Sequence, residues 1–151
     1  MKAKLALLGM MAILALTMMA CGGAEGAADF KQWEVNVSCD NFSEQGNITR
    51  NMEVAVGDTI TVTLCSNAST GFQWSEMAQI GDANMLEQVN HEYVAPEADG
   101  NETLLVGAPG REVWTFKALE KGTTTVDMEY SRPWEGGEKG VWTFVLIVTV
   151  E

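Results

Sequence analysis

Apolar and polar side chains alternate through most of the chain from residue 31 onward. The alternation is clear in five runs, at Trp33/Val35/Val37, Met52/Val54/Val56, Ile60/Val62/Leu64, Val126/Met128/Tyr130 and Trp142/Phe144/Leu146/Val148/Val150. A period of two places the apolar side chains on one face of a β-strand, whereas a helix needs a period of 3.6. We therefore expect a chain that is nearly all β, with one face of each strand buried.

The segments between these runs predict further short strands and turns. Another strand is expected over 113–118, two shorter ones over 89–93 and 103–106, and there is room for one helical turn in 75–86. Turn-forming residues lie at 57–58, 96–100, 121–122 and 136–140. Short strands with turns at this spacing are typical of an antiparallel β-sandwich with Ig-like architecture.

The first 20 residues have the pattern of a secretory signal peptide. Lys2 and Lys4 precede an uncharged apolar stretch that ends in Ala20 and Cys21. This ending is similar to a bacterial lipobox, in which the cysteine becomes the lipidated first residue; cleavage beside an incidental cysteine is the alternative. Residues 21–30 then predict a flexible tether and residues 31–151 a single domain. We expect an exported protein, lipid-anchored outside the cytoplasmic membrane, in the periplasm or at the cell surface.

The charge of the mature chain excludes two classes of partner. Without Lys2 and Lys4, seven Lys and Arg residues remain against 21 Asp and Glu residues, a net charge of −14. Such a charge repels nucleic acid and anionic lipid headgroups. We therefore expect no nucleic-acid partner, and membrane contact only through a lipid on Cys21.

Two further cysteines are placed to form a disulfide. Strands over 33–39, 48–56 and 59–65 would form a meander in which the first and third strands run in the same direction. Cys39 and Cys65 would end those two strands, at the same end of the sheet. An oxidising compartment favours their pairing. We predict a Cys39–Cys65 bridge beside the loop that follows Cys65, with two buried free thiols as the alternative.

Three loop tips have a composition that simple chain reversal does not require. They lie in the stretches SNASTGFQW (66–74), LLVGAPGREVWTF (104–116) and YSRPW (130–134). The first is rich in hydroxyl groups and contains Gly71, which can adopt a positive φ. Pro133 and the glycines at 136 and 137 favour a projecting third loop.

In this order and spacing, the three stretches resemble the loops of the chagasin family (I42), inhibitors of papain-like cysteine proteases. The first is similar to that family's Asn-Pro-Thr-Thr-Gly-Tyr/Phe-x-Trp loop, the second to its Gly-rich loop and the third to its Arg-Pro-Trp loop. The resemblance covers roughly residues 46–151. Ala68 and Ser69 replace the usual Pro and Thr, and Pro109 replaces a Gly, which removes one backbone donor.

The resemblance implies an Ig-like sandwich whose loops 66–72, 107–111 and 131–137 enter the protease cleft as a wedge and block it reversibly. It places the first loop over the catalytic Cys–His pair, with the hydroxyls of Ser69 and Thr70 in reach of the enzyme. The second loop lies on the non-primed side and Trp134 on the primed side. The implied protease-binding residues are Asn67, Ala68, Ser69, Thr70, Gly71, Phe72, Gly107, Ala108, Pro109, Gly110, Arg111, Arg132, Pro133 and Trp134.

Several of these residues also have structural interpretations. We expect Arg132 to support the loops by bonding backbone carbonyls, and Gly71 to serve backbone geometry alone. Because Phe72 and Trp74 begin a strand, they are expected in the core rather than in contact with an enzyme. Other expected core aromatics are Trp114, Phe116, Trp142 and Phe144.

Two other functions compete with inhibition. An enzyme would need a Cys65–His91 dyad with a free Cys65, and no common catalytic motif is present. A calcium site at 97–102 lacks the EF-hand spacing. The second alternative is an extracellular Ig-like module that binds another protein or a glycan. We expect a monomeric inhibitor that is not an enzyme and uses no cofactor or metal.

Overall fold

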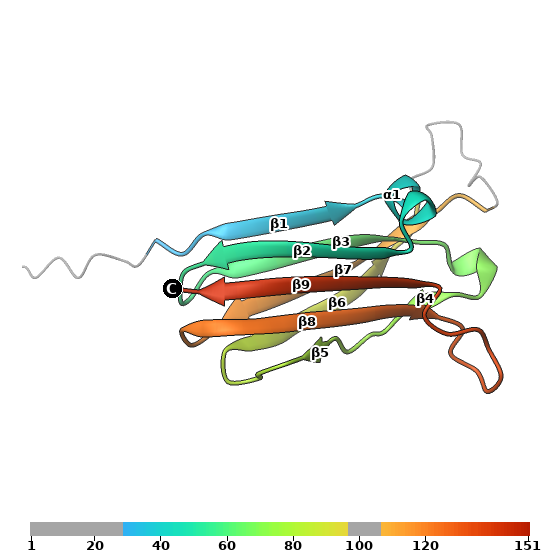
Figure 1. Ribbon diagram of the computed structural model, residues 1–151. Coiled ribbons are helices and arrows are strands. Elements are labelled where there is room, and N and C mark those ends of the chain that lie inside the picture. Colours follow the sequence, from blue (N-terminus) through green and yellow to red (C-terminus); the bar gives the residue numbers. More distant parts are fainter. Residues whose placement is uncertain (1–28, 97–106) are drawn as a thin grey trace, which may run out of the picture.

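The computed structural model describes residues 29–96 and 107–151, which form two β-sheets packed face to face (Figure 1). The elements are β1 (Gln32–Val37), α1 (Cys39–Glu44), β2 (Asn47–Val54), β3 (Thr59–Ser66), η1 (Ala68–Thr70), β4 (Gln73–Trp74), β5 (Gln79–Ile80), β6 (Leu86–Val94), β7 (Gly110–Ala118), β8 (Gly122–Ser131) and β9 (Trp142–Val150). The predicted β-sandwich is confirmed.

Each sheet contains one parallel pair of strands, so the sandwich is not purely antiparallel. The strand orders are β1-β3-β7-β6 and β2-β9-β8-β4, with β5 paired to β8. β1 runs parallel to β3, and β2 runs parallel to β9. The predicted meander is therefore wrong, because β2 belongs to the opposite sheet. β1 and β3 do run in the same direction, as predicted. They are, however, direct neighbours in the sheet, with no strand between them.

A short helix begins where the end of a strand was predicted. The Ser38 side chain accepts a hydrogen bond from the Asn41 backbone, and the Asn41 side chain accepts one from the Ser38 backbone. This reciprocal cap satisfies donors that a helix N-terminus leaves free, and it begins α1 at Cys39. Phe42 on α1 is buried and stacks on Trp142 at 5.1 Å between ring centroids. The helix thus closes one end of the core.

Most of the predicted apolar faces form the core between the sheets, but Val56 of the 52–56 run lies beyond β2 and is exposed. The largest fully buried side chains of the core are Trp74, Trp114, Phe42, Phe116, Phe144, Ile60, Leu64, Leu86, Leu146, Val62, Val126 and Val148. Each large apolar side chain contributes roughly 1.5–3 kcal/mol when fully buried. Trp142, expected in the core, is only partly buried at its edge.

A buried carboxylate connects strands at the end of the sandwich where β1 begins. Asp58 accepts hydrogen bonds from the Trp33 indole at 2.8 Å and from the backbone nitrogens of Lys31 at 2.9 Å and Ala55 at 3.0 Å. The Trp33 bond, followed by the two backbone bonds, holds the pKa of Asp58 below its ordinary value. This group joins the start of β1 to the β2–β3 turn.

One predicted segment has a different conformation in the structure, and several others lie outside the residues that it describes. Residues 75–86, where one helical turn was predicted, instead form β5 and a turn that leads into β6. The signal peptide, Cys21, most of the tether, the 103–106 strand and the 97–102 acidic turn lie outside the described residues. Within the described ranges, no helix has the length and apolarity to cross a membrane, and no group of three or more metal-ligating side chains is found.

Candidate functional site

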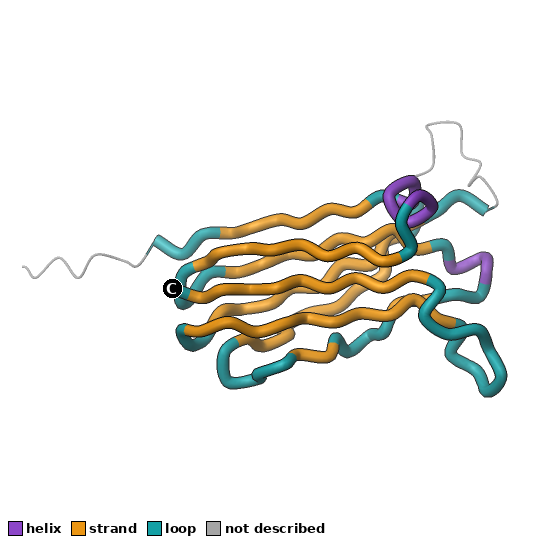
Figure 2. Tube along the Cα trace, viewed as in Figure 1, coloured by secondary structure: helices purple, strands orange, loops and turns teal. Residues whose placement is uncertain are grey.

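The three loop tips lie together at one end of the sandwich, opposite the end where β1 begins (Figure 2). We call residues 66–72 the first loop, 107–111 the second loop and 131–137 the third loop. The Asn67 side-chain amide donates to the Gly107 carbonyl at 3.1 Å, which joins the first two loops. The Arg132 guanidinium lies 4.3 Å from the centre of the Phe72 ring, which joins the first and third. The predicted clustering of the tips is therefore confirmed.

The first loop is a single turn of 3₁₀-helix stabilised by its own side chains. Asn67 begins the turn, and its side-chain oxygen accepts hydrogen bonds from the Ser69 backbone at 3.2 Å and hydroxyl at 2.6 Å. The Thr70 hydroxyl donates to the Asn67 carbonyl at 2.7 Å. Gly71 ends the turn with φ +76°, a conformation that glycine adopts without strain. Ala68, Ser69 and Thr70 are exposed at the tip.

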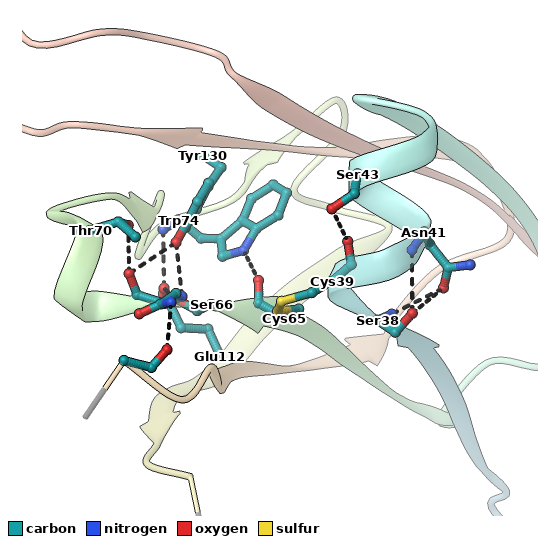
Figure 3. The surroundings of a disulfide bond; sticks show 12 residues. Ser38, Cys39, Asn41, Ser43, Cys65, Ser66, Thr70, Trp74, Glu112 and Tyr130 are labelled. Carbon is teal, nitrogen blue, oxygen red and sulfur yellow. Dashed lines mark hydrogen bonds between the residues drawn. A yellow bond between two sulfur atoms is a disulfide. The ribbon is translucent and has the colours of Figure 1, made fainter. Parts of the chain in front are cut away.

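The predicted disulfide joins α1 to the base of the first loop. Cys39 and Cys65 are bonded, with their Cα atoms 5.1 Å apart, and the Cys65 carbonyl accepts from the Trp74 indole at 2.9 Å (Figure 3). Cys65 directly precedes the first loop, and Trp74 follows it on β4, after Gln73. The bridge therefore stabilises the position of this loop. Because Cys65 is disulfide-bonded, it cannot be the nucleophile of a Cys65–His91 dyad.

Glu112 is a site residue that the sequence analysis missed. Its side chain is buried on β7, and one carboxylate oxygen accepts from the Ser66 hydroxyl at 2.7 Å and the Trp74 backbone at 3.1 Å. The other oxygen lies 3.0 Å from His91 Nε2. A charged residue two positions before the inward-facing Trp114 was the available signal. His91 is half-buried on β6.

Tyr130 connects the first loop to the strand that leads into the third loop. Its hydroxyl accepts a hydrogen bond from the Asn67 backbone nitrogen at 2.9 Å, while its ring is buried. Phe72 stacks on this ring at 5.5 Å and is itself partly buried. Alternation predicted Tyr130 only as a core residue, because the hydroxyl partner lies 63 positions away in the chain. Phe72 and Trp74 both pack against or within the core, as expected.

The third loop presents an exposed tryptophan whose indole also contacts the first loop. Trp134 is 51% exposed, and a Cβ at Gly71 would lie 2.7 Å from its ring. The prediction that Gly71 serves backbone geometry alone is therefore wrong, since the indole occupies the space of its missing side chain. The prediction that Arg132 bonds backbone carbonyls is wrong for the described residues: its guanidinium stacks on Phe72 and faces Trp134 instead. The Arg132 carbonyl accepts a hydrogen bond from the Lys139 ammonium.

The second loop lies beside the first, at the start of β7. Gly107 has φ +89° and is exposed, as are Pro109 and Arg111. Gly110 lies in close contact with β6. A Cβ at this position would be 2.5 Å from the Val94 carbonyl and 2.6 Å from the Tyr93 hydroxyl. Pro109 has no backbone N–H, and the Gly107 carbonyl already accepts from Asn67. The backbone of this loop therefore has fewer free hydrogen-bonding groups for a partner.

The sequence and the fold both match characterised proteins. A sequence model described as chagasin family peptidase inhibitor I42 matches residues 53–148. Amoebiasin-2 of Entamoeba histolytica is 29% identical over 99 residues, which cover 66% of this chain and 76% of that protein. Chagasin of Trypanosoma cruzi is 31% identical over 87 residues, covering 56% and 74%.

Two solved structures share the fold of this chain. One is the cysteine protease inhibitor EhICP2 from Entamoeba histolytica, with a TM-score of 0.62, 21% identity and coverage of 83% of this chain and all of the other. The second is PbICP-C, solved in complex with falcipain-2, with a TM-score of 0.57, 19% identity and coverage of 77% and 98%. The family is one of inhibitors and not of enzymes. On its sequence match across most of the sandwich, this chain belongs to the chagasin family of peptidase inhibitors.

Proposed function

We propose that this domain inhibits papain-like cysteine proteases by placing its three loop tips in the active-site cleft. Family membership supports the proposal, as do the solved relatives: EhICP2 is described as a cysteine protease inhibitor and PbICP-C is bound to falcipain-2. The inhibition is reversible, since the tips cover the nucleophilic cysteine without offering it a peptide bond to cut.

The mutual contact of the three tips is the observation that carries this proposal. Asn67 bonds Gly107, Arg132 stacks on Phe72, and Trp134 lies over Gly71. A flexible peptide loses conformational entropy when it binds a cleft, but loops already held by one another lose little more. An interface of ordinary size, ~800 Å² per partner, can then reach nanomolar affinity.

Each loop has a proposed place in the cleft. Ala68, Ser69 and Thr70 form the exposed tip that covers the catalytic Cys–His pair. The hydroxyls of Ser69 and Thr70 donate their hydrogens within the loop, so their oxygens remain as acceptors for an N–H of the enzyme. Trp134 lies on the primed side, where a rigid aromatic supplies contact area. The second loop lies on the non-primed side.

We also propose that the domain is exported, lipid-anchored through Cys21 and monomeric. The apolar signal segment ending in Cys21 and the disulfide between Cys39 and Cys65 support export to an oxidising compartment. β1 begins at the end of the sandwich opposite the loops, so an anchor before Gln32 would leave the loops facing away from the membrane. A Cys21→Ser variant should move from the membrane fraction to the soluble fraction and lose the lipid mass.

Titration of papain with the purified domain, from residue 22 onward, tests the inhibitory function. We expect complete loss of peptide hydrolysis near one domain per enzyme, full recovery on dilution and an intact domain by mass spectrometry. No effect on papain and several related enzymes would refute inhibition and favour the alternative of a binding or adhesion module. Light scattering of the free domain measures its oligomeric state.

A further inference from the structure

We propose that Glu112 is a positioning residue that determines whether the domain acts as an inhibitor or as a substrate of its protease. This inference rests on the proposed inhibitory function and concerns the first loop. Glu112 lies on β7 and is 4% exposed, so it has no direct contact with an enzyme. Its effect would therefore be exerted through the conformation of the loop.

A single oxygen of Glu112 holds both ends of the first loop. Ser66 is the last residue of β3, in one sheet, and Trp74 lies on β4, in the other sheet. The Ser66 hydroxyl and the Trp74 backbone nitrogen both donate to Glu112 Oε1, at 2.7 and 3.1 Å. The distance between the two ends of the loop is thus set by one carboxylate oxygen from a third strand.

The carboxylate is held in place by its second oxygen. Glu112 Oε2 lies 3.0 Å from His91 Nε2 on β6, and the His91 ring packs on Trp114 at 4.8 Å. Hydrogen bonds to a buried carboxylate are about twice as strong as those between neutral groups. The network therefore connects the first loop to β6 and to the strand that follows the second loop.

The first loop has little side-chain packing on the side where Glu112 lies. A hollow of about 340 Å³ is found there, lined among others by Ser66, Phe72, His91, Glu112 and Trp134. Elsewhere the loop is held by the Tyr130 hydroxyl, which bonds the Asn67 backbone, and by Trp134, which lies over Gly71 and also lines the hollow. Without the Glu112 bonds, the loop would have both the space and the freedom to open toward the hollow.

The opened loop would be a substrate because proteases cleave extended chains. The 3₁₀ turn at Ala68–Thr70 keeps its peptide bonds in a helical conformation, unlike the extended strand that a protease cleft accepts. Once the turn is released, the enzyme thiolate can attack a carbonyl within 67–73, the new amine leaves, and water hydrolyses the thioester. The products are two fragments whose masses sum to that of the domain plus one water, held together only by the fold.

Four variants separate positioning from general structural support. Glu112→Ala removes all three bonds, Glu112→Gln keeps an amide oxygen for Ser66 and Trp74, and Ser66→Ala removes one bond. Glu92→Ala is the matched control, because this exposed carboxylate lies on β6 beside His91 and outside the network. Each variant is titrated against papain, its dissociation rate is measured, and its mass is followed during long incubation with the enzyme.

We expect Glu112→Ala to raise the inhibition constant at least about tenfold and to be cut within 67–73 over time. Glu112→Gln should recover most of the affinity and stay intact, Ser66→Ala should show a smaller loss, and Glu92→Ala should match the unmodified domain. An intact Glu112→Ala domain with unchanged affinity would overturn the proposal. So would a Glu112→Gln variant as weak and as easily cut as Glu112→Ala.

Two further measurements keep the test decisive. If Glu112→Ala does not fold, Ser66→Ala still provides the test, because it removes one of the two hydrogen bonds to Glu112 Oε1. Amide hydrogen exchange of residues 67–73 is measured without any protease, with residues 142–150 of β9 as the internal reference. Faster exchange confined to the loop supports the positioning role even if papain is not inhibited, whereas unchanged exchange in Ser66→Ala refutes it.

Discussion

The indole of Trp134 lies over Gly71, so the third loop rests on the first. A Cβ added to Gly71 would lie 2.7 Å from the indole, closer than side chains pack, and Gly71 itself has φ +76°. One residue without a side chain therefore allows both the turn of the first loop and the approach of the third.

Gly71→Ala should raise the inhibition constant against papain at least about tenfold. Alanine at a positive φ costs roughly 1–2 kcal/mol, and its methyl group would also displace Trp134. The control is Gly136→Ala, since Gly136 has φ +72° but a Cβ there meets nothing within 4 Å. Equal effects of the two substitutions on inhibition would show that the contact with Trp134 is unimportant.

Trp134→Ala should weaken inhibition by ~2 kcal/mol or more, about thirtyfold in the inhibition constant. Trp134 is 51% exposed, so part of its indole is available to an enzyme while another part contacts the first loop. Phe30→Ala is the control, because Phe30 is 60% exposed near the start of β1, at the far end of the sandwich. An inhibition constant unchanged by Trp134→Ala would remove this residue from the protease contact.

Loss of the disulfide should destabilise the fold by ~3 kcal/mol. The bridge spans 26 positions, and a cross-link of that length removes conformational entropy from the unfolded chain. The comparison is urea unfolding of the Cys39→Ala/Cys65→Ala double variant against the unmodified domain from residue 22 onward, both under non-reducing conditions. Equal unfolding midpoints with equal slopes would argue against a stabilising role for the bridge.

Asp58→Asn should lower the melting temperature at neutral pH. Asp58 uses both carboxylate oxygens as acceptors, for Lys31, Trp33 and Ala55, whereas an asparagine has one acceptor oxygen. Asp40→Asn is the control, because Asp40 is exposed on α1. A melting temperature equal to that of the control at pH 7 would contradict the prediction.

The effect of Asp58 should also depend on pH in a definite direction. Its pKa in the folded state lies below the ordinary 3.8, because the hydrogen bonds from Trp33, Lys31 and Ala55 favour the charged form. The folded chain therefore binds this proton less readily than the unfolded chain, and the stabilisation is present above pH 3.8. It is lost as the pH falls through the lower, folded-state pKa. Thermal unfolding from pH 7 to pH 2.5 should show the difference from Asp58→Asn shrinking at the acid end.

The strands were predictable from local spacing, but their partners were not. Alternation in 60–64, 126–130 and 142–150 lies within β3, β8 and β9, because a period of two leaves one face apolar. Whether β2 pairs with β3 or with β9 depends on packing between distant segments, and the meander was the wrong choice. The strand ending at Cys39 was also wrong, because a local cap between Ser38 and Asn41 favoured a helix there.

In the candidate site, amino-acid composition identified the three loop tips but not the contacts that hold them in place. Hydroxyls, glycines and a proline before Trp134 marked the three loops, since such residues are unusual together in simple turns. Glu112 lies two positions before the inward-facing Trp114, but the predicted strand began at residue 113, so no buried charge was predicted there. Its partners could not be predicted, because Ser66 lies 46 positions away and His91 21 positions away.

By itself the sequence determined most of the strands, their buried faces and the loops with unusual tips, because these depend on residues close together in the chain. Only the tertiary structure decided that Asn67 meets Gly107, that Trp134 covers Gly71 and that one carboxylate on Glu112 joins both ends of the first loop. Such contacts form when two sheets pack and distant segments reach the same edge, and their energy depends on that packing rather than on local spacing.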